Sequence, residues 1–313
     1  MTADRPIALQ LCPFSPSLEA ALQDRFSVVR WFEIQDHEGW LQAHAADVRA
    51  VVTGGHVGIA SDLMQRLPSL GVVAINGVGF DKVDLELARR RGVRVSNTPD
   101  VLTEDVADLA VGLVIALLRG IVAADRYVRD GRWPTGEMPL ARKVSGRRFG
   151  IVGLGRIGAA IAARLSAFGP VSYTGRAPKA APYAYVADLE ALARGSDVLV
   201  LSCAANAQTR GLIGPAVLDA LGPRGVLVNV SRGAVVDEPA LIAALAQGRL
   251  AGAALDVYAD EPRVPEALIG MPNVILTPHI ASATEEGRRR MAELVLENLD
   301  AHFAGAPMPS ALV

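Results

Sequence analysis

Short apolar runs, typical of buried strands, alternate along this chain with amphipathic runs that are typical of helices. In the first hundred residues the predicted strands are Ile7–Leu11, Ser27–Trp31, Ala50–Thr53, Val72–Ile75 and Arg94–Val95. The predicted helices between them are Leu18–Asp24, Asp62–Leu67 and Leu85–Arg91, the last closed by Gly92. This alternation predicts an α/β fold, in which a parallel sheet carries helices on both faces.

A second series of the same kind begins at Phe149. Its predicted strands cover residues 149–152, 171–174, 198–201, 226–230, 251–255 and 274–276, and its predicted helices lie near 156–168, 187–194, 215–221 and 238–247. This is the doubly wound pattern of a dinucleotide-binding (Rossmann) domain. Between the two series, the very apolar run Thr103–Leu118 predicts a long helix that is buried between domains or in a subunit interface.

The last amphipathic segment, Gly287–Phe303, follows the final strand of the second series and is too late in the chain to belong to that sheet. We expect it to pack on the first series, which would make the first domain discontinuous. The predicted domains are therefore residues 1–98 with 287–313, and residues 99–286.

A glycine-rich turn, Gly153-Leu-Gly-Arg-Ile-Gly158, directly follows the apolar run Phe149-Gly-Ile-Val152. In a dinucleotide site the first glycine allows a tight turn, the second lets the backbone approach a pyrophosphate, and the third lets helix and strand pack closely. Such turns also occur for purely structural reasons. The strand before this one and the amphipathic segment Ala159–Phe168 after it favour a dinucleotide site, with phosphates at the helix N-terminus.

The segment after the next predicted strand bears on the choice of cofactor. NAD-binding domains usually place an acidic residue there for the ribose 2′-hydroxyl, but Val171-Ser-Tyr-Thr-Gly-Arg-Ala-Pro-Lys179 contains none. Arg176 and Lys179 can pair with a 2′-phosphate, and Thr174 can add a hydrogen bond. The two cations could instead be ordinary solvated loop residues. The missing acid leads us to predict NADP(H) over NAD(H).

Composition limits the possible partners and surroundings. The chain has 313 residues, of which 51% are hydrophobic, enough to form the cores of two domains. A net charge of −2 gives no reason to expect nucleic acid or an anionic membrane as a partner. No apolar run reaches the length of a membrane span, and no signal-peptide pattern is present. Cys12 and Cys203 are not a disulfide framework, so we expect a cytoplasmic protein, and we predict no metal site.

Three polar residues of the second series fall just beyond predicted strands, where open α/β sheets bind ligands. They are Arg232, Glu261 and His279. A guanidinium can bind a substrate carboxylate in a bidentate manner, and an imidazole can protonate a carbonyl oxygen as hydride arrives. A carboxylate can hold the ring and favour its protonated form. Together they would form a reductase site.

Each of these residues also has a purely structural explanation. Arg232 could be a surface cation, the Glu261-Pro pair a turn, and His279 a satisfied structural histidine, so only their joint placement supports chemistry. His56, in Gly54-Gly-His-Val-Gly58, could line a substrate cleft, but we favour a structural or rim role. His37 and His44 lie in a polar stretch that we expect to be exposed.

These motifs together resemble the D-isomer-specific 2-hydroxyacid dehydrogenase family over nearly the whole chain. The resemblance rests on Gly77-Val-Gly79, Asn97-Thr-Pro-Asp100, Thr103, the glycine loop, Ser231-Arg-Gly233, Leu255-Asp-Val257, Asp260-Glu-Pro262 and Pro278-His279. It implies two doubly wound parallel-sheet domains, one a Rossmann domain and the other a smaller, flavodoxin-like substrate domain. It also implies reversible hydride transfer between nicotinamide and a 2-oxo or 2-hydroxy acid.

The resemblance further implies a role for each site residue. His279 would be the acid/base, Glu261 its partner, and Arg232 the anchor of the carboxylate and polariser of the carbonyl. Asp256 would bond the nicotinamide carboxamide. Further cofactor contacts are expected at Gly153, Leu154, Gly155, Arg156, Ile157, Gly158, Thr103, Cys203, Thr209, Val230, Ser231 and His279. Substrate contacts are expected at Gly54, Gly55, Val78, Gly79 and Ser282.

Two subgroups of the family are similar enough to compete. Tyr173-Thr-Gly-Arg176 is similar to NADPH-dependent glyoxylate/hydroxypyruvate reductases, whereas Asp105-Val-Ala-Asp-Leu109 resembles plant hydroxyphenylpyruvate reductases. Gly136 stands where the former carry a second Trp, which implies a differently lined pocket. Met138 and Leu140 are candidates for an apolar wall in an aryl-pyruvate site.

We predict an NADPH-dependent reductase of small 2-oxo acids, with an aryl-pyruvate reductase as the neighbouring alternative. A dinucleotide-sensing interaction protein would call for a long tail or a peptide-docking extension, which the sequence lacks. A Rossmann protein without redox chemistry leaves Arg232, Glu261 and His279 without a purpose. The apolar helix at 103–118 and the arm after it predict a two-fold homodimer.

Overall fold

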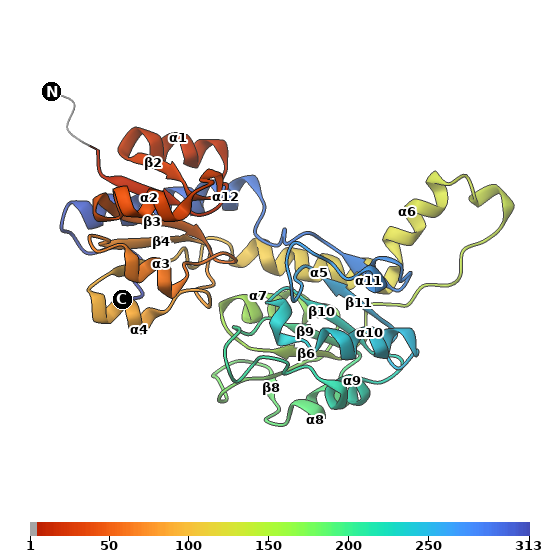
Figure 1. Ribbon diagram of the computed structural model, residues 1–313. Coiled ribbons are helices and arrows are strands. Elements are labelled where there is room, and N and C mark those ends of the chain that lie inside the picture. The colour runs from red at the N-terminus through yellow and green to blue at the C-terminus, as the bar shows by residue number, and fades with distance from the viewer. Residues whose placement is uncertain (1–4) are drawn as a thin grey trace. The chain divides into compact units, whose positions relative to one another are not determined.

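The computed structural model describes residues 5–313, which fall into two compact units (Figure 1). The first unit runs as far as Leu102 and resumes at Ala283–Val313, and the second unit is Thr103–Ser282. The second unit is therefore four residues shorter at each end than the expected domain 99–286, and the first unit is correspondingly longer. Beyond the last strand of the first unit, Thr98 donates its backbone N–H to the Gly77 carbonyl at 2.9 Å.

The first unit contains a five-stranded, wholly parallel sheet in the order β2-β1-β3-β4-β5, which is the flavodoxin-like order. Its strands are β1 (Ile7–Gln10), β2 (Ser27–Arg30), β3 (Val48–Gly54), β4 (Val72–Asn76) and β5 (Arg94–Ser96). Its helices are α1 (Pro16–Arg25), α2 (His37–His44), α3 (Ser61–Arg66), α4 (Leu85–Arg91) and α12 (Glu285–Phe303), with short 3₁₀ turns at Trp31–Glu33 and Ala45–Asp47.

Successive residues of these strands face opposite sides of the sheet, because side chains alternate along a strand. Leu9 packs in the apolar cluster on one face, whereas Ala8 packs in the cluster on the other face. The second cluster includes Val295 and Leu299 of α12, so the last helix completes the core of the first unit. The C-terminal tail adds to the sheet edge, where Leu312 donates its N–H to Val95 at 2.7 Å.

The second unit contains a seven-stranded parallel sheet in the order β12-β11-β10-β9-β6-β7-β8. Its strands are β6 (Phe149–Val152), β7 (Val171–Thr174), β8 (Ala184–Tyr185), β9 (Val198–Leu201), β10 (Val226–Asn229), β11 (Gly252–Leu255) and β12 (Val274–Leu276). Counted from β6, this is the Rossmann order with one extra strand at the far edge. The predicted α/β class with two doubly wound parallel sheets is therefore confirmed.

The helices of the second unit cover both faces of this sheet (Figure 1). They are α5 (Thr103–Arg119), α6 (Ile121–Arg129), α7 (Arg156–Leu165), α8 (Leu189–Arg194), α9 (Pro215–Leu221), α10 (Glu238–Ala246) and α11 (Glu266–Ile269), with 3₁₀ turns at Trp133–Thr135 and Gly233–Val235. The apolar face of α5 packs against α7 and the strands β10, β11 and β12, so much of its hydrophobic surface is buried within its own unit.

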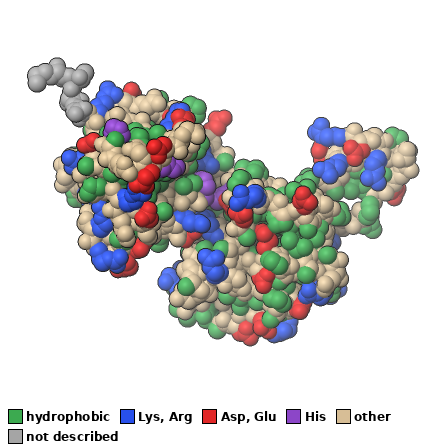
Figure 2. All heavy atoms as spheres, viewed as in Figure 1, with side chains coloured by type: hydrophobic (Ala, Val, Ile, Leu, Met, Phe, Trp, Pro, Cys, Tyr) green, Lys and Arg blue, Asp and Glu red, His purple; other side chains and the backbone are tan. Residues whose placement is uncertain are grey.

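Helix α6 and the segment after it project from the body of the second unit (Figure 1). Five of the large apolar side chains here are at least half exposed: Ile121 and Val122 at 50%, Val128 at 54%, Trp133 at 69% and Leu140 at 100%. Figure 2 shows hydrophobic side chains among the charged ones on this projecting arm, residues 121–143. In residues 5–313 no single helix has the length and apolarity to cross a membrane; α5 and α6 pass that test only as a pair bent by 61°.

Candidate active site

The glycine loop has the geometry that each of its glycines predicts. Gly153 has a φ of +95°, and a side chain there would meet the Cys203 backbone at 2.7 Å. Gly158 faces the Gly153 carbonyl so closely that no Cβ fits between them. By contrast, Gly155 borders open space at the start of α7, and no side chain caps that helix. The loop is thus a cradle of backbone N–H groups that a pyrophosphate fits.

This cradle lies where the strand order of the second sheet reverses, between β6 and β9. Ser202, which follows β9, donates its hydroxyl to the Gly153 carbonyl at 2.8 Å. Next to it, Cys203 is partly buried, and burial raises the pKa of its thiol to about 11. The thiol is therefore neutral and can only pack. Ligands of open α/β sheets bind at such a reversal, so the predicted cofactor residues of both loops are brought together here.

The predicted 2′-phosphate residues lie on the loop after β7. Thr174 is buried at the end of the strand, whereas Arg176 and Lys179 are exposed. Neither the Arg176 guanidinium nor the Lys179 ammonium makes a hydrogen bond or ion pair within residues 5–313. Both cations can therefore pair with a phosphate without first giving up a carboxylate.

Arg232 follows β10 in a loop that its neighbours hold from both sides. The Asn229 amide donates to the Arg232 carbonyl at 3.0 Å and accepts from the Ser231 hydroxyl at 2.8 Å. Arg232 Nη1 donates to the Ser231 carbonyl at 2.8 Å. Gly233 packs so closely on the backbone of Tyr258 that any side chain there would collide with it. This contact joins the Arg232 loop to the loop that carries Glu261.

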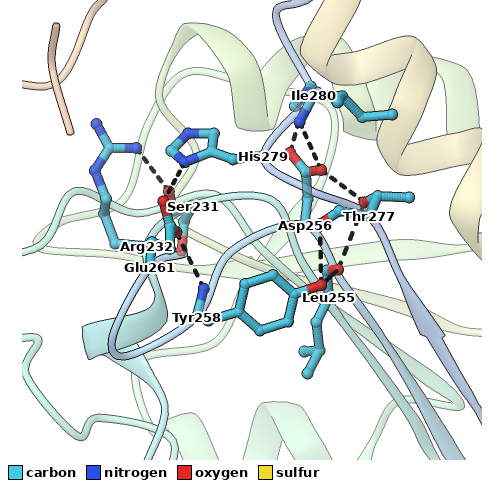
Figure 3. Close-up of polar contacts among 10 residues, drawn as sticks. Ser231, Arg232, Leu255, Asp256, Tyr258, Glu261, Thr277, His279 and Ile280 are labelled. Atoms are coloured by element: carbon cyan, nitrogen blue, oxygen red, sulfur yellow. Dashed lines mark hydrogen bonds and ion pairs between the residues drawn. The ribbon is translucent and has the colours of Figure 1, made fainter. Parts of the chain in front are cut away.

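Glu261 and His279 are joined by a hydrogen bond, with 2.6 Å between Glu261 Oε2 and His279 Nδ1 (Figure 3). The other carboxylate oxygen accepts the Tyr258 N–H at 3.1 Å. Burial works to raise the pKa of Glu261, but the hydrogen bond and charge of His279, the Tyr258 N–H and the charge of Arg232 outweigh it and lower that pKa. Glu261 is therefore ionised and orients the ring, so that Nε2 is the nitrogen that can serve a substrate.

The backbone that carries His279 is fixed from below by Asp256, which is fully buried (Figure 3). Its carboxylate accepts three hydrogen bonds from this loop: from the Thr277 hydroxyl at 2.6 Å and from the N–H groups of Ile280 and Ala281, both at 2.9 Å. The Asp256 carbonyl accepts the His279 N–H at 2.9 Å. His279 itself has a φ of +53°, a conformation that costs energy for a residue other than glycine and is held by these contacts.

Two supporting residues of this network were not found by sequence reasoning. The Tyr258 hydroxyl donates to the carbonyls of Leu255 and Thr277, at 3.1 and 3.0 Å, and so ties the end of β11 to the end of β12. Burial and the nearby Asp256 raise the pKa of Tyr258 to about 12, so the phenol stays a donor. Both Tyr258 and Thr277 directly flank the motifs that were recognised, which is the one signal that could have pointed to them.

The predicted substrate loops of the first unit also come together. The backbones of Gly55 and Gly79 are so close that a Cβ on Gly55 would lie 2.8 Å from the Gly79 carbonyl oxygen. Asn97 donates its side-chain N–H to the Val78 carbonyl at 2.8 Å, which fixes the second loop. A Cβ on Gly54 would lie 2.8 Å from the His56 ring. His56 therefore stands beside this pair of loops, on their exposed side.

The remaining predicted residues lie in or next to these loops. Leu154, Arg156 and Ile157 belong to the glycine loop and the first turn of α7, Val230 and Ser231 precede Arg232, and Ser282 ends the second unit. Thr209 uses its hydroxyl within its own turn, where it donates to Ala204 at 2.8 Å and accepts from Asn206. Thr103 is the first residue of α5. Among residues 5–313, no group of three or more metal-ligating side chains is placed to hold an ion.

Comparison with known proteins decides the family. The model for the NAD-binding domain of D-isomer-specific 2-hydroxyacid dehydrogenases matches residues 111–281. The chain belongs to this dehydrogenase family. It is 48% identical to a hydroxyphenylpyruvate reductase of Plectranthus scutellarioides over 307 residues, which cover 97% of this chain and 98% of the relative. It is equally identical, with the same coverage, to glyoxylate/hydroxypyruvate reductase A of Arabidopsis thaliana.

Solved structures agree with this assignment to the 2-hydroxyacid dehydrogenases. An NADPH-dependent glyoxylate/hydroxypyruvate reductase from Sinorhizobium meliloti, in complex with NADP and malonate, superposes with a TM-score of 0.92 at 42% identity. The match covers 99% of this chain and 97% of that one. The predicted resemblance is confirmed, and the protein is an oxidoreductase with an NAD(P)-binding domain.

Proposed function

We propose that this dehydrogenase reduces glyoxylate and hydroxypyruvate to glycolate and D-glycerate with NADPH. The observation that carries the proposal is the Glu261–His279 pair, 2.6 Å apart, with the loop of Glu261 packed against that of Arg232. Relatives at 42 to 48% identity that bear the names of such reductases support the same substrate class.

In this proposal the three side chains divide the reaction among them. The bound nicotinamide supplies the hydride. Arg232 binds the substrate carboxylate and polarises the carbonyl group. The carbonyl carbon then accepts hydride more readily, because the guanidinium stabilises the negative charge that develops on the oxygen. His279 donates the proton from Nε2 to that oxygen, while Glu261 stabilises the imidazolium and holds the ring. The backbone N–H groups of the loops at Gly54–Gly55 and Val78–Gly79, together with Ser282, are the further substrate contacts that we propose.

We propose the second unit as the NADP-binding domain and the first as the substrate domain. The cradle at Gly153–Gly158 fits a pyrophosphate, as its open side at Gly155 indicates. The preference for NADPH over NADH rests on Arg176 and Lys179, two exposed cations after β7, and on the lack of an acidic residue between Val171 and Lys179. Asp256 keeps acceptor capacity beyond its three loop contacts, so a bond to the nicotinamide carboxamide remains part of the proposal.

The aryl-pyruvate alternative needs an apolar wall, for which Met138 and Leu140 are candidates. Leu140 instead lines a pocket with Ile115, Phe168 and Val144, just before the start of β6. That is the amino-terminal edge of the sheet, whereas His279 follows the carboxyl end of β12. Within one chain, therefore, Leu140 is not part of the His279 site.

The proposal is tested by His279→Ala with His44→Ala as the control, since His44 is exposed on α2 in the first unit. Loss of the proton donor lowers kcat for glyoxylate by roughly two to four powers of ten. The Kd for NADPH, followed by fluorescence, stays the same. Turnover by His279→Ala near that of the control would exclude His279 as the acid.

A further inference from the structure

The loop that carries Arg176 and Lys179 runs from the end of β7 to the short edge strand β8. Its residues 175–180 are all exposed, and nothing lies within 4 Å of a Cβ built on Gly175. A segment of this kind loses much conformational entropy when a ligand orders it. Contacts that hold it in place beforehand would therefore strengthen binding.

Two tyrosines hold this loop at its two ends. At the far end, the Tyr173 hydroxyl accepts the Lys179 N–H at 2.6 Å and donates to the Lys179 carbonyl at 3.3 Å. At the near end, the Tyr185 hydroxyl donates to the Gly175 carbonyl at 3.2 Å. Both phenols therefore bond to the backbone of the loop, and they leave the side chains of Arg176 and Lys179 to a ligand.

The two tyrosines are themselves fixed by the sheet. Tyr173 on β7 is paired in register with Tyr185 on β8, and their ring centroids lie 5.4 Å apart with the ring planes inclined by 54°. Tyr173 is 1% exposed, so its ring is anchored in the core of the second unit. The edge strand β8 thus serves to bring a second hydroxyl to the loop.

We propose that Tyr173 and Tyr185 are positioning residues for cofactor selection, because they hold the Gly175–Lys179 backbone in the shape in which Arg176 and Lys179 meet the 2′-phosphate of NADPH. This inference rests on the proposed NADPH preference. It adds that the preference depends on two phenol hydroxyls that do not contact the phosphate. The adenosine of NADH, which has no 2′-phosphate, gains nothing from the two cations.

The test compares Tyr173→Phe and Tyr185→Phe with Tyr183→Phe, a matched control whose hydroxyl has no hydrogen bond within residues 5–313. For Tyr185→Phe, loss of one hydrogen bond raises KM for NADPH roughly two- to tenfold. KM for NADH and kcat with either cofactor stay at the level of the control. A general structural defect would instead change the kinetics with both cofactors.

Arg176→Ala provides a second, independent comparison through a double-mutant cycle. In the Arg176→Ala background, Tyr185→Phe has less effect on KM for NADPH than it has in the wild type, because the group that the loop positions is gone. Equal effects in the two backgrounds would overturn the inference, and so would wild-type KM values for NADPH in both single tyrosine variants. Tyr185 is only partly buried, so this variant serves if Tyr173→Phe does not fold.

The same measurements separate this inference from the proposal on which it rests. A wild-type enzyme that uses NADH as well as NADPH would overturn both. A wild-type enzyme that prefers NADPH, with the preference kept in both tyrosine variants, would overturn only the role of the tyrosines.

Discussion

The hydroxyl of Thr277, which lies two residues before His279 in the chain, is 2.6 Å from Oδ1 of the fully buried Asp256. The same carboxylate also accepts the backbone N–H groups of Ile280 and Ala281. His279 is therefore held between anchored neighbours on both sides. The position of the imidazole depends on a carboxylate that need not touch the substrate.

Weakening this anchor should lower kcat. In Thr277→Val the hydroxyl is lost at nearly constant volume, and we expect kcat for glyoxylate to fall about tenfold through the loss of one charge-assisted hydrogen bond. Thr277→Ser keeps the hydroxyl and should recover most of the loss. Steady-state kinetics and the Kd for NADPH are measured for both variants. A raised Kd for NADPH with an unchanged kcat in Thr277→Val would show that the contact serves the cofactor and not the proton donor.

The pH dependence of reduction should reflect the lowered pKa of Glu261. A carboxyl group with a depressed pKa keeps its ionic contacts above that pKa and loses them only as the pH falls through it. The Glu261–His279 pair should therefore persist as the pH is lowered through 4.5, the ordinary value for Glu. The measurement is the pH profile of kcat/KM for glyoxylate, with circular dichroism to exclude unfolding.

Glu261→Gln is the matched variant for this profile. A neutral amide cannot stabilise the imidazolium, so Glu261→Gln should reduce glyoxylate more slowly than the wild type. An acid limb at or above pH 4.5 in the wild type that disappears in Glu261→Gln would contradict the lowered pKa.

Gly233 should tolerate no side chain. Its would-be Cβ collides with the backbone of Tyr258, so Gly233→Ala must separate the Arg232 loop from the Glu261 loop. We expect a loss of stability of about 1–3 kcal/mol, typical of overpacking, together with a lower kcat/KM. Gly270→Ala is the control, since its Cβ would meet only ordinary contacts at 3.9 Å or more. If Gly233→Ala matched this control in thermal unfolding and in kinetics, the close approach of Gly233 to the Tyr258 backbone would be refuted.

The projecting arm makes a prediction about assembly. Ile121, Val128, Trp133 and Leu140 are each at least half exposed, and we propose that a second copy of the chain covers them in a two-fold homodimer. Light scattering should give the mass of a dimer for the wild type. Leu140→Asp should shift the equilibrium toward the monomer, whereas a monomeric mass for the wild type would contradict the proposal.

The sequence predicted those features that depend on pattern. Alternating apolar runs located both sheets, and strand ends located Arg232, Glu261 and His279, because hydrophobic periodicity and the strand-end rule act over short stretches. The polar helix α2, with its capping Asp36, was missed because its pattern is weakly amphipathic. Strand β8 was missed because it has two residues and exists only through its pairing with β7.

Contacts between distant segments could not be predicted in the same way. The bonds from Tyr173 and Tyr185 to their loop depend on the register of β7 and β8 and on the path of the backbone after Gly175. Likewise, the family resemblance led us to expect a cofactor contact at Asp256, but its three bonds to the His279 loop require the geometry of two loops at once. Such partners are set by tertiary structure and leave no local signal.

The central claim is reduction of small 2-oxo acids with NADPH, and steady-state kinetics of the wild type test it most directly. Oxidation of NADPH and of NADH is followed in parallel with glyoxylate, hydroxypyruvate and phenylpyruvate. We predict the highest kcat/KM for glyoxylate and hydroxypyruvate, with NADPH preferred over NADH. A preference for phenylpyruvate, or no turnover of either small acid, would contradict the account.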